Sequence, residues 1–292
     1  MTGSVNFQRG GDPAISPDGR RLAMERQTGN SMQVWLYEMG RGIMTRLALD
    51  EGFSWFPVWS PDARQVAYSA NRGGTWGIYR KDVGGAGQEE LLLGAIKYGA
   101  SPSSWSRDGR YLLYETGDAQ VYGSTVYGRG RGIFLLPLTG NPQERKAVPF
   151  VQTPFRAGNA QFSPDGKWVA YESDESGRSE VYIQAFPSTG AKWQVSNNEG
   201  TQPRWRGDGR ELFFISGTTQ RLLSAGIRAS AGRVEIETPR ALFPVLQFPG
   251  PAYLYDVTPD GQRFVVVSPP GGGAQGSTAI NIVSDWQAGL KK

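Results

Sequence analysis

The stretch VWSPDARQVAY (58–68) recurs with variation along the 292-residue chain. The related stretches are AISPDGRRLAM (14–24), SWSRDGRYLLY (104–114), QFSPDGKWVAY (161–171), RWRGDGRELFF (204–214) and DVTPDGQRFVV (256–266). Each places an aspartate in a turn between two short, mostly apolar runs, and these aspartates are Asp18, Asp62, Asp108, Asp165, Asp208 and Asp260. They recur at intervals of about 43 to 57 residues, and a repeat of this length built from short strands is typical of a β-propeller blade.

The repeat around Asp62 can be divided into four expected strands, at 57–60, 65–70, 77–82 and 90–93. The Asp-Gly pair of most repeats, replaced here by Asp62-Ala63, favours a tight hairpin between the first two strands. The second strand is apolar on both faces, as expected for a sheet packed between neighbouring sheets. The sequence therefore predicts an all-β fold, a six-bladed β-propeller with four-stranded antiparallel blades, in a single domain over residues 1–292.

The two ends of the chain are expected to close the ring together. After Asp260, strands can be placed at 263–268 and 279–284, but no convincing fourth strand follows. The residues before Asp18 and after Asp260 together make up about one repeat. We therefore expect residues 5–8, near the N-terminus, to supply the fourth strand of the last blade.

The composition excludes several kinds of chemistry. The chain has 0 Cys and 0 His, so it can form neither a disulfide nor a Ser-His-Asp or Cys-His catalytic site. Zinc sites built on histidine or cysteine are excluded as well. Carboxylates, lysine, tyrosine or an oxygen-ligated metal remain for catalysis. We expect a non-catalytic protein, although the composition alone does not decide this.

Charge and hydropathy restrict the partners. The net charge is +4, but the basic residues are scattered, whereas nucleic-acid binders concentrate them on one face or helix. No apolar run reaches the ~18–20 residues of a membrane helix, and the first residues lack the apolar segment of a signal peptide. We expect no nucleic-acid partner and no direct membrane insertion.

Repetition separates structural residues from candidate binding residues. An aspartate present in every repeat serves the blade, so we expect the six aspartates to cap turn amides. Ligands are often bound by loops on a rigid scaffold, here the loops opposite the Asp turns. Their aromatic and polar residues form a candidate site for a peptide, a sugar or a protein loop, namely Phe53, Trp55, Phe56, Tyr98, Phe155, Arg156, Asn159, Gln202, Tyr253 and Tyr255. The alternative is that the aromatic rings only plug the channel and pack between blades.

The third repeat has the longest interval. Its segment 117–131 is rich in glycine and carries the further candidate ligand residues Tyr122, Tyr127, Arg129 and Arg131. We expect a Gly-rich loop, which is either an arm that closes over a ligand or a long hairpin. It lacks the lysine and the strand–loop–helix context of a P-loop, which argues against a phosphate cradle.

Two further arrangements of charged residues are predicted. Arg204 and Asp256 hold equivalent positions in consecutive repeats, which favours a structural ion pair between blades. Asp12, Asn159 and Glu199 could supply oxygen ligands to a candidate channel cation such as Ca²⁺. Nothing in their spacing requires a metal, and we otherwise expect no cofactor.

The combination of SPDG, an apolar strand, and an S-x-(Asn/Asp)-x-x-G turn resembles TolB-type β-propeller repeats. The second half of the pattern is seen in SANRGGTWGIY (69–79) and SDESGRSEVY (173–182). The segments DVTPDGQRF and INIVSDWQAGLKK are also similar to the C-terminal propeller region of bacterial, especially acidobacterial, serine/threonine kinases. The chain contains no kinase motif, so the resemblance implies a propeller that is attached to a kinase domain in a longer protein.

This resemblance implies a function. The leading expectation is a non-catalytic ligand- or protein-binding module, acting as the sensor of a bacterial signalling protein, in an extracytoplasmic or periplasmic location. One alternative is a metal-assisted hydrolase or lyase with oxygen ligands in the channel, and another is a periplasmic interaction scaffold like TolB. Related repeats occur in prolyl-oligopeptidase-like enzymes and in an oligogalacturonate lyase, but this chain has no G-x-S-x-G motif and no histidine to carry over.

Overall fold

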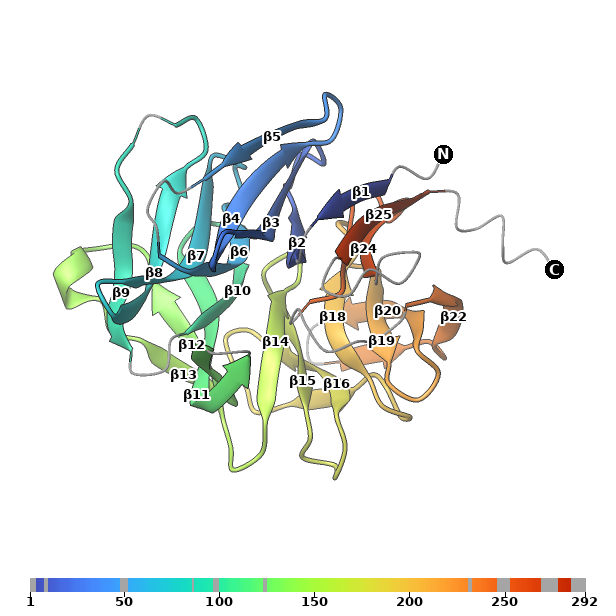
Figure 1. Ribbon diagram of the computed structural model, residues 1–292. Helices are drawn as coiled ribbons and strands as arrows, with labels where there is room; N and C mark the ends of the chain where they lie inside the picture. The colour runs from blue at the N-terminus through green and yellow to red at the C-terminus, as the bar shows by residue number, and fades with distance from the viewer. Residues whose placement is uncertain are drawn as a thin grey trace.

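The chain forms a ring of six antiparallel blades, which confirms the predicted six-bladed propeller (Figure 1). A parallel bridge between Arg131 and Ala157 joins the third and fourth blades into one sheet. The computed structural model describes residues 4–7, 10–47, 52–85, 87–96, 100–122, 125–230, 233–245, 253–268 and 278–284. The first strands of the blades contact one another in cyclic order around the centre, including the contact between the sixth blade and the first. Within these described segments, no helix has the length and apolar character needed to cross a membrane.

Each blade has four main strands, and the strands of each blade are given below in order from the channel outward. Blade 1 consists of β2 (Gly10–Ile15), β3 (Arg21–Thr28), β4 (Ser31–Glu38) and β5 (Ile43–Arg46). Blade 2 consists of β6 (Ser54–Trp59), β7 (Gln65–Arg72), β8 (Thr75–Asp82) and β9 (Glu90–Ile96). Blade 3 consists of β10 (Ser101–Trp105), β11 (Tyr111–Tyr122), β12 (Thr125–Pro137) and β13 (Val148–Gln152). A short 3₁₀ turn, η1 (Pro142–Glu144), precedes β13.

The second half of the ring repeats this plan. Blade 4 consists of β14 (Ala157–Phe162), β15 (Trp168–Ser173), β16 (Glu180–Ala185) and β17 (Lys192–Gln194). Blade 5 consists of β18 (Thr201–Trp205), β19 (Glu211–Ser216), β20 (Arg221–Ser230) and β22 (Arg240–Pro244), with β21 (Arg233–Ile236) paired to the far end of β20. Blade 6 consists of β23 (Tyr255–Val257), β24 (Arg263–Ser268), β25 (Thr278–Ser284) and β1 (Ser4–Phe7).

The N-terminal strand completes the last blade, as the sequence predicted. β1 pairs antiparallel with β25, with Ser4 opposite Asn281 and Phe7 opposite Thr278. Both strands lie side by side at the outer edge of blade 6 (Figure 1). The ring is therefore closed by backbone hydrogen bonds between the two ends of the chain.

The six repeated aspartates cap their turns, which confirms the structural role predicted for them. In every repeat, the carboxylate accepts a hydrogen bond from the backbone N–H two residues later, at 2.9–3.1 Å. In all repeats but the fifth, a Ser or Thr hydroxyl two residues earlier also donates to it, at 2.5–2.7 Å. Arg206 stands at this hydroxyl position in the fifth repeat.

A separate hydrophobic cluster fills each interface between neighbouring blades. Between blades 1 and 2, for example, Val34 and Leu36 of β4 pack with Trp59, Val66 and Tyr68. The five other interfaces contain equivalent clusters. Each blade is thus buried on both faces, which explains why its central strands are apolar throughout rather than alternating.

The segment 117–131 differs from its prediction as a Gly-rich loop. The strands β11 and β12 continue through it, with Asp118 opposite Arg129 and Tyr122 opposite Thr125. Continuous pairing explains the difference, because the backbone of this segment is held by ladder hydrogen bonds despite its glycines. The described residues of the segment therefore form a paired hairpin, and its closure over a ligand stays a prediction.

Candidate functional site

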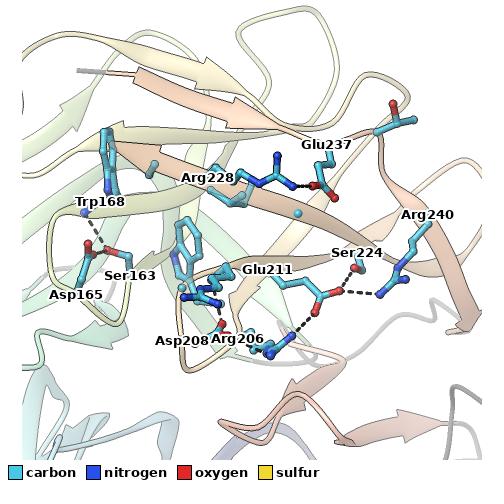
Figure 2. A pocket seen from close by; sticks show the side chains of 17 residues that line it. Ser163, Asp165, Trp168, Arg206, Asp208, Glu211, Ser224, Arg228, Glu237 and Arg240 are labelled. Carbon is cyan, nitrogen blue, oxygen red and sulfur yellow. Dashed lines mark hydrogen bonds and ion pairs between the residues drawn. The ribbon is translucent and has the colours of Figure 1, made fainter. Parts of the chain in front are cut away.

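A cleft of about 810 Å³ opens between blades 4 and 5, on the face that carries the Asp turns. Asp165 and Asp208, from the turns of the two blades, lie at its rim, and Trp168 and Trp205 contribute to its walls (Figure 2). The volume falls within the ~300–1,000 Å³ of typical ligand sites. The cleft is therefore large enough for a ligand of several chemical groups.

The far wall of the cleft comes from an extension of blade 5. Strand β19 begins at Glu211, opposite Gly226 of β20, so residues 227–230 of β20 continue beyond it and pair with β21 instead. This β20–β21 hairpin carries Arg228 into the wall. The long interval between Asp208 and Asp260 in the sequence was the signal for this additional hairpin.

A buried carboxylate organises the charged residues of the cleft. The carboxylate of Glu211 accepts a hydrogen bond from the hydroxyl of Ser224. It also pairs with Arg206 Nη1 at 3.3 Å and with Arg240 Nη2 at 3.1 Å (Figure 2). Arg206 pairs in addition with Asp208, at 3.1 Å. Glu211 thus holds two guanidinium groups, one from the turn after β18 and one from β22 of the same blade.

A second ion pair lies higher in the cleft. Arg228 Nη2 is 2.8 Å from Glu237 Oε1, and both side chains project into the opening (Figure 2). The Glu237 carboxylate lies directly over Gly226, where an added Cβ would collide with Oε2. Because Gly226 has no side chain, the Glu237 carboxylate has room to form this ion pair.

The predicted aromatic residues on the opposite face gather in a cluster inside the channel. Trp55, Phe56 and Tyr253 pack with Trp76, and the Trp55 and Trp76 ring centroids are 5.1 Å apart. Phe53 is half-buried against them. Since blade 1 separates blades 2 and 6, the contact with Tyr253 crosses the channel. Trp55, Phe56 and Tyr253 are only 5–6% exposed, which favours channel packing, the alternative weighed for these rings.

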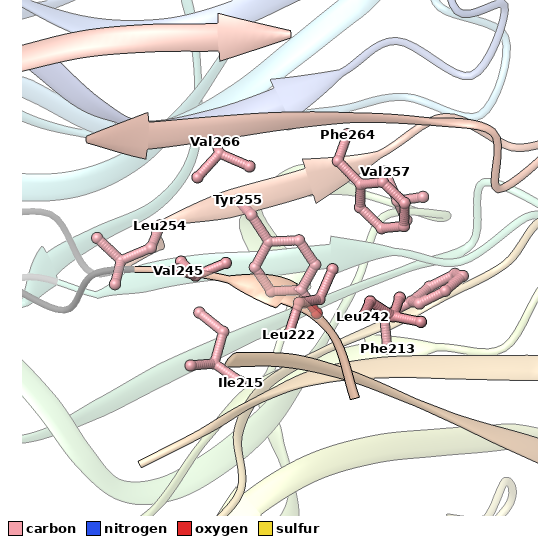
Figure 3. Packing of buried hydrophobic residues seen from close by; sticks show 10 residues of the cluster. All are labelled: Phe213, Ile215, Leu222, Leu242, Val245, Leu254, Tyr255, Val257, Phe264 and Val266. Atoms are coloured by element: carbon pink, nitrogen blue, oxygen red, sulfur yellow. The ribbon is translucent and has the colours of Figure 1, made fainter. Parts of the chain in front are cut away.

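Tyr255 is fully buried in the hydrophobic cluster between blades 5 and 6 (Figure 3). It packs with Leu222 and Val245, and its hydroxyl donates to the backbone carbonyl of Gln202 at 2.9 Å. Burial raises the pKa of Tyr255 well above its usual range. Of the predicted site residues, Tyr255 and Gln202 thus meet at a blade interface.

The predicted pair of Arg204 with Asp256 is confirmed. Arg204 Nε lies 3.3 Å from Asp256 Oδ1, and both side chains are buried. The Arg204 guanidinium also lies over the ring of Tyr253, 4.3 Å from its centroid, in the geometry of a cation–π contact. These contacts join blade 5 to blade 6 at the end of the channel.

Carboxylates near the channel accept hydrogen bonds from backbone amides of neighbouring blades. Glu25 Oε1 accepts from Phe56 N–H at 2.9 Å, and Glu172 Oε2 accepts from the amide of Gln202 at 2.9 Å. Glu115 accepts from the amide of Asn159 in the same way. The three glutamates hold one equivalent position, seven residues after the repeated aspartate. Their common role is to connect blades.

The three residues that donate these backbone hydrogen bonds share an unusual backbone conformation. Phe56, Asn159 and Gln202 have φ values of 52–56°, in the left-handed region, at a register shift in the first strand of each blade. Such β-bulges turn an amide out of the strand ladder. The neighbouring carboxylate satisfies that amide, which would otherwise be buried without a partner.

Asp12 and Glu25 form a hydrogen-bonded pair of acids at the channel. Both are buried, and Asp12 also accepts a hydrogen bond from the amide of Tyr253. Burial, followed by the proximity of Asp12, raises the pKa of Glu25 well above its usual range. No group of three Asp, Glu, His or Cys side chains suited to a metal ion occurs in the described segments. The predicted set of Asp12, Asn159 and Glu199 contains only two acids, so the channel cation stays a prediction.

Phe155 and Arg156 lie outside the buried aromatic cluster. Phe155, which is 45% exposed, lines a shallow hollow of about 510 Å³ with Tyr182 and Lys192. Arg156 is exposed beside it. Tyr98 lies outside the described residues, and the structure describes only the backbone of Tyr122, Tyr127, Arg129 and Arg131.

The comparisons with known proteins agree with this architecture. Residues 3–129 match the model of the TolB beta propeller domain, PD40. TolB from Acinetobacter baumannii is similar in structure, with a TM-score of 0.62 and 18% identity over 97% of this chain and 64% of that one. Oligogalacturonate lyase from Vibrio parahaemolyticus has a TM-score of 0.55 and 12% identity, over 96% and 91% of the two chains. At such identities the two likenesses show the fold, a β-propeller, and within it residues 3–129 are similar to the TolB beta propeller domain.

One curated relative aligns with part of the chain. It is the uncharacterized peptidase YuxL of Bacillus subtilis, 27% identical over 208 residues, which cover 59% of this chain and 31% of that protein. This chain thus spans about a third of the length of the relative. The resemblance to kinase-associated propellers stays a prediction.

Proposed function

We propose that the chain is a non-catalytic binding propeller, which captures its ligand in the cleft between blades 4 and 5. The observation that carries this proposal is the pairing inside the cleft. Glu211 is engaged by Ser224, Arg206 and Arg240, and Glu237 is engaged by Arg228. A general base must be able to take up a proton from a substrate, and carboxylates held by guanidinium groups are poorly suited to that task.

The sequence and the channel support the same proposal. The chain has 0 His and 0 Cys, so a histidine-dependent peptidase or lyase mechanism cannot operate within it. The channel carboxylates Glu25, Glu115 and Glu172 connect blades through backbone amides. We further propose that the propeller is the sensor part of a longer, extracytoplasmic bacterial signalling protein. The short alignment with YuxL, 31% of that protein, is compatible with such a modular arrangement.

A combined turnover and binding experiment tests the proposal. The purified chain is assayed on polygalacturonate and on chromogenic peptides, with and without EDTA. The same preparation is then melted in the presence of peptides and cell-wall sugars. We expect no turnover, together with a rise in Tm for at least one compound. Arg240→Gln should abolish that rise, whereas Arg233→Gln, on the outer hairpin, should preserve it.

Two other outcomes would identify the alternatives. Turnover that EDTA abolishes, and that Glu211→Gln or Asp12→Asn removes, would establish a metal-assisted hydrolase or lyase instead. The chain could also show neither turnover nor a Tm shift and still retain a protein partner. If the Arg240→Gln variant retains that partner as well, the chain is an interaction scaffold that uses another surface.

A further inference from the structure

We infer that the ligand of the cleft between blades 4 and 5 is an extended, acidic polypeptide segment. The inference rests on the proposed binding function and names the chemical class of the ligand.

The guanidinium groups of the cleft are more exposed than the carboxylates that hold them. The side chain of Arg240 is 61% exposed, whereas its partner Glu211 is 11% exposed. Arg228 is 75% exposed against 56% for Glu237. Although arginines and acids line the cleft in similar numbers, these pairs present mainly positive charge to solvent. An incoming carboxylate can bind the outer N–H groups of a guanidinium without displacing the inner acid.

Arg210 adds a further positive group. Its backbone N–H donates to Asp208 at 3.0 Å, and its side chain is exposed at the cleft. Within the described part of the chain, no carboxylate lies within ion-pair distance of its guanidinium. The charge of Arg210 is therefore available to a ligand.

The distribution of the arginines favours a chain of acids over a single anion. Arg210 follows the Asp208 turn, Arg228 lies on the β20–β21 hairpin and Arg240 begins β22. They come from three different parts of blade 5, and Arg228 and Arg240 lie apart from each other in the cleft (Figure 2). Several carboxylates spaced along one ligand match such a distribution better than one phosphate group does.

The groups between the arginines fit a polypeptide. The half-buried ring of Trp205 offers an apolar surface to intervening side chains, and Thr238 offers a hydroxyl group. Mixed apolar and polar contacts of this kind are typical of peptide recognition by a preformed groove. An acidic segment with apolar residues between its carboxylates would use both kinds of contact.

Fluorescence anisotropy with defined peptides tests the inference. The probe is a fluorescein-labelled ten-residue peptide of alternating Glu and Leu, and the control peptide has Gln in place of each Glu. We expect the Glu peptide to bind and the Gln peptide to bind at least about tenfold more weakly. Affinity for the Glu peptide should fall as NaCl is raised, because the contacts are between exposed charges.

Matched variants of the protein locate the site. The double substitution Arg228→Gln and Arg240→Gln should weaken binding of the Glu peptide by at least about tenfold. The control is Arg233→Gln, since Arg233 is also 75% exposed but pairs with Glu235 outside the cleft, and it should bind like the unchanged protein. The Tm of each variant is measured as well, and because these side chains are largely exposed, it should stay close to that of the unchanged protein.

Three results would overturn the inference. The first is unchanged binding by the double variant, which would place the peptide elsewhere. The second is competition by inorganic phosphate at peptide-like concentrations, which would indicate a single-anion site. The third is that the unchanged protein binds an oligogalacturonate but not the Glu peptide, and that the double variant no longer binds the oligogalacturonate. That third result would replace the ligand class and leave the proposed binding function intact, whereas turnover of any probe would contradict the proposed function itself.

Discussion

Arg204 and Asp256 form a buried ion pair that joins blade 5 to blade 6, with Arg204 Nε 3.3 Å from Asp256 Oδ1. The second oxygen of the same carboxylate accepts the backbone N–H of Ile15, in blade 1, at 2.6 Å. One side chain in blade 6 is therefore bound to both neighbouring blades. Burial raises the pKa of Asp256, while Arg204 and these hydrogen bonds act in the opposite direction.

Removing Arg204 should destabilise the ring strongly. Arg204→Met leaves the Asp256 carboxylate buried without its cation, and breaking a buried pair in this way costs about 3–5 kcal/mol. Urea unfolding of the two proteins measures the difference. Arg204→Met combined with Asp256→Asn should recover part of the loss, because no buried charge remains. A loss below about 1 kcal/mol in the single variant, the size expected for a surface pair, would show that the ion pair is not important.

Substituting Glu25 should change the pH dependence of stability. The pKa of Glu25 is raised in the folded protein by burial and by Asp12, from a usual value of 4.5. The contribution of protonated Glu25 to the unfolding free energy is therefore complete below about pH 4.5. This contribution is lost as the pH rises through the pKa of Glu25 in the folded protein. Glu25→Gln, which cannot ionise, should flatten the decline in unfolding free energy between acidic and mildly alkaline pH. Glu38→Gln, at an exposed position, is the control, and an equally flat profile in that variant would contradict the assignment.

The turn aspartate Asp62 should produce the opposite pH dependence of stability at acid pH. The hydroxyl of Ser60 and the amide of Arg64 lower the pKa of Asp62 from 3.8. The corresponding stabilisation is present above about pH 3.8 and is lost as the pH falls through the lower, folded value. Ser60→Ala should therefore raise the pKa of Asp62, as seen by NMR titration of the carboxyl carbon. No change in that titration would show that the hydroxyl has little influence.

Deleting residues 1–7 should lower the Tm by many degrees. The deletion removes β1, whose partner β25 then becomes an unpaired edge, and blade 6 loses one of its four strands. Scanning calorimetry of the full and shortened chains gives the difference. If the synthetic peptide 1–12 restores the Tm when it is added back, the effect belongs to strand pairing. An unchanged melt of the shortened chain would show that β1 does not close the ring in solution.

Two aromatic substitutions should separate the channel cluster from the exposed surface. Trp55 is 5% exposed within the cluster, and Trp55→Ala should cost about 3–5 kcal/mol because it leaves a cavity. Phe155 is 45% exposed, and Phe155→Ala should change stability by less than about 0.5 kcal/mol. Chemical denaturation measures both. Equal effects would mean that Trp55 is less tightly packed than the structure indicates.

The fold could be predicted from the sequence because the same turn and strand pattern recurs in every blade. The Asp turn marks each blade locally, with a hydroxyl two residues earlier in all repeats but the fifth, as in Ser60 and Asp62, and it does not depend on distant contacts. Even the closing strand near Val5 could be placed, since one blade lacked a strand and only one end of the chain remained unassigned. The inter-blade pair of Arg204 and Asp256 followed from their equivalent positions in consecutive repeats.

The cleft between blades 4 and 5 could not be predicted from the sequence in the same way. Aromatic residues near the blade ends look alike in the sequence whether their side chains face solvent, like Phe155, or are buried in a cluster, like Trp55. The cleft depends on β20 extending past Glu211, and strand length cannot be read from the repeat. The pairing of Glu211 with Arg240 joins residues that are far apart in the sequence, without any motif to indicate it.

The closing pair of strands also determines how the ring would respond to mechanical tension. Ser4 lies opposite Asn281, so the chain enters β1 and leaves β25 at the same end of the two-stranded ladder. A pull between the two termini would therefore load one hydrogen-bonded pair at a time, like a zipper opened from its end, and would not shear the whole ladder at once. The β1–β25 pair would therefore separate at low force, while the other five blades keep their strands.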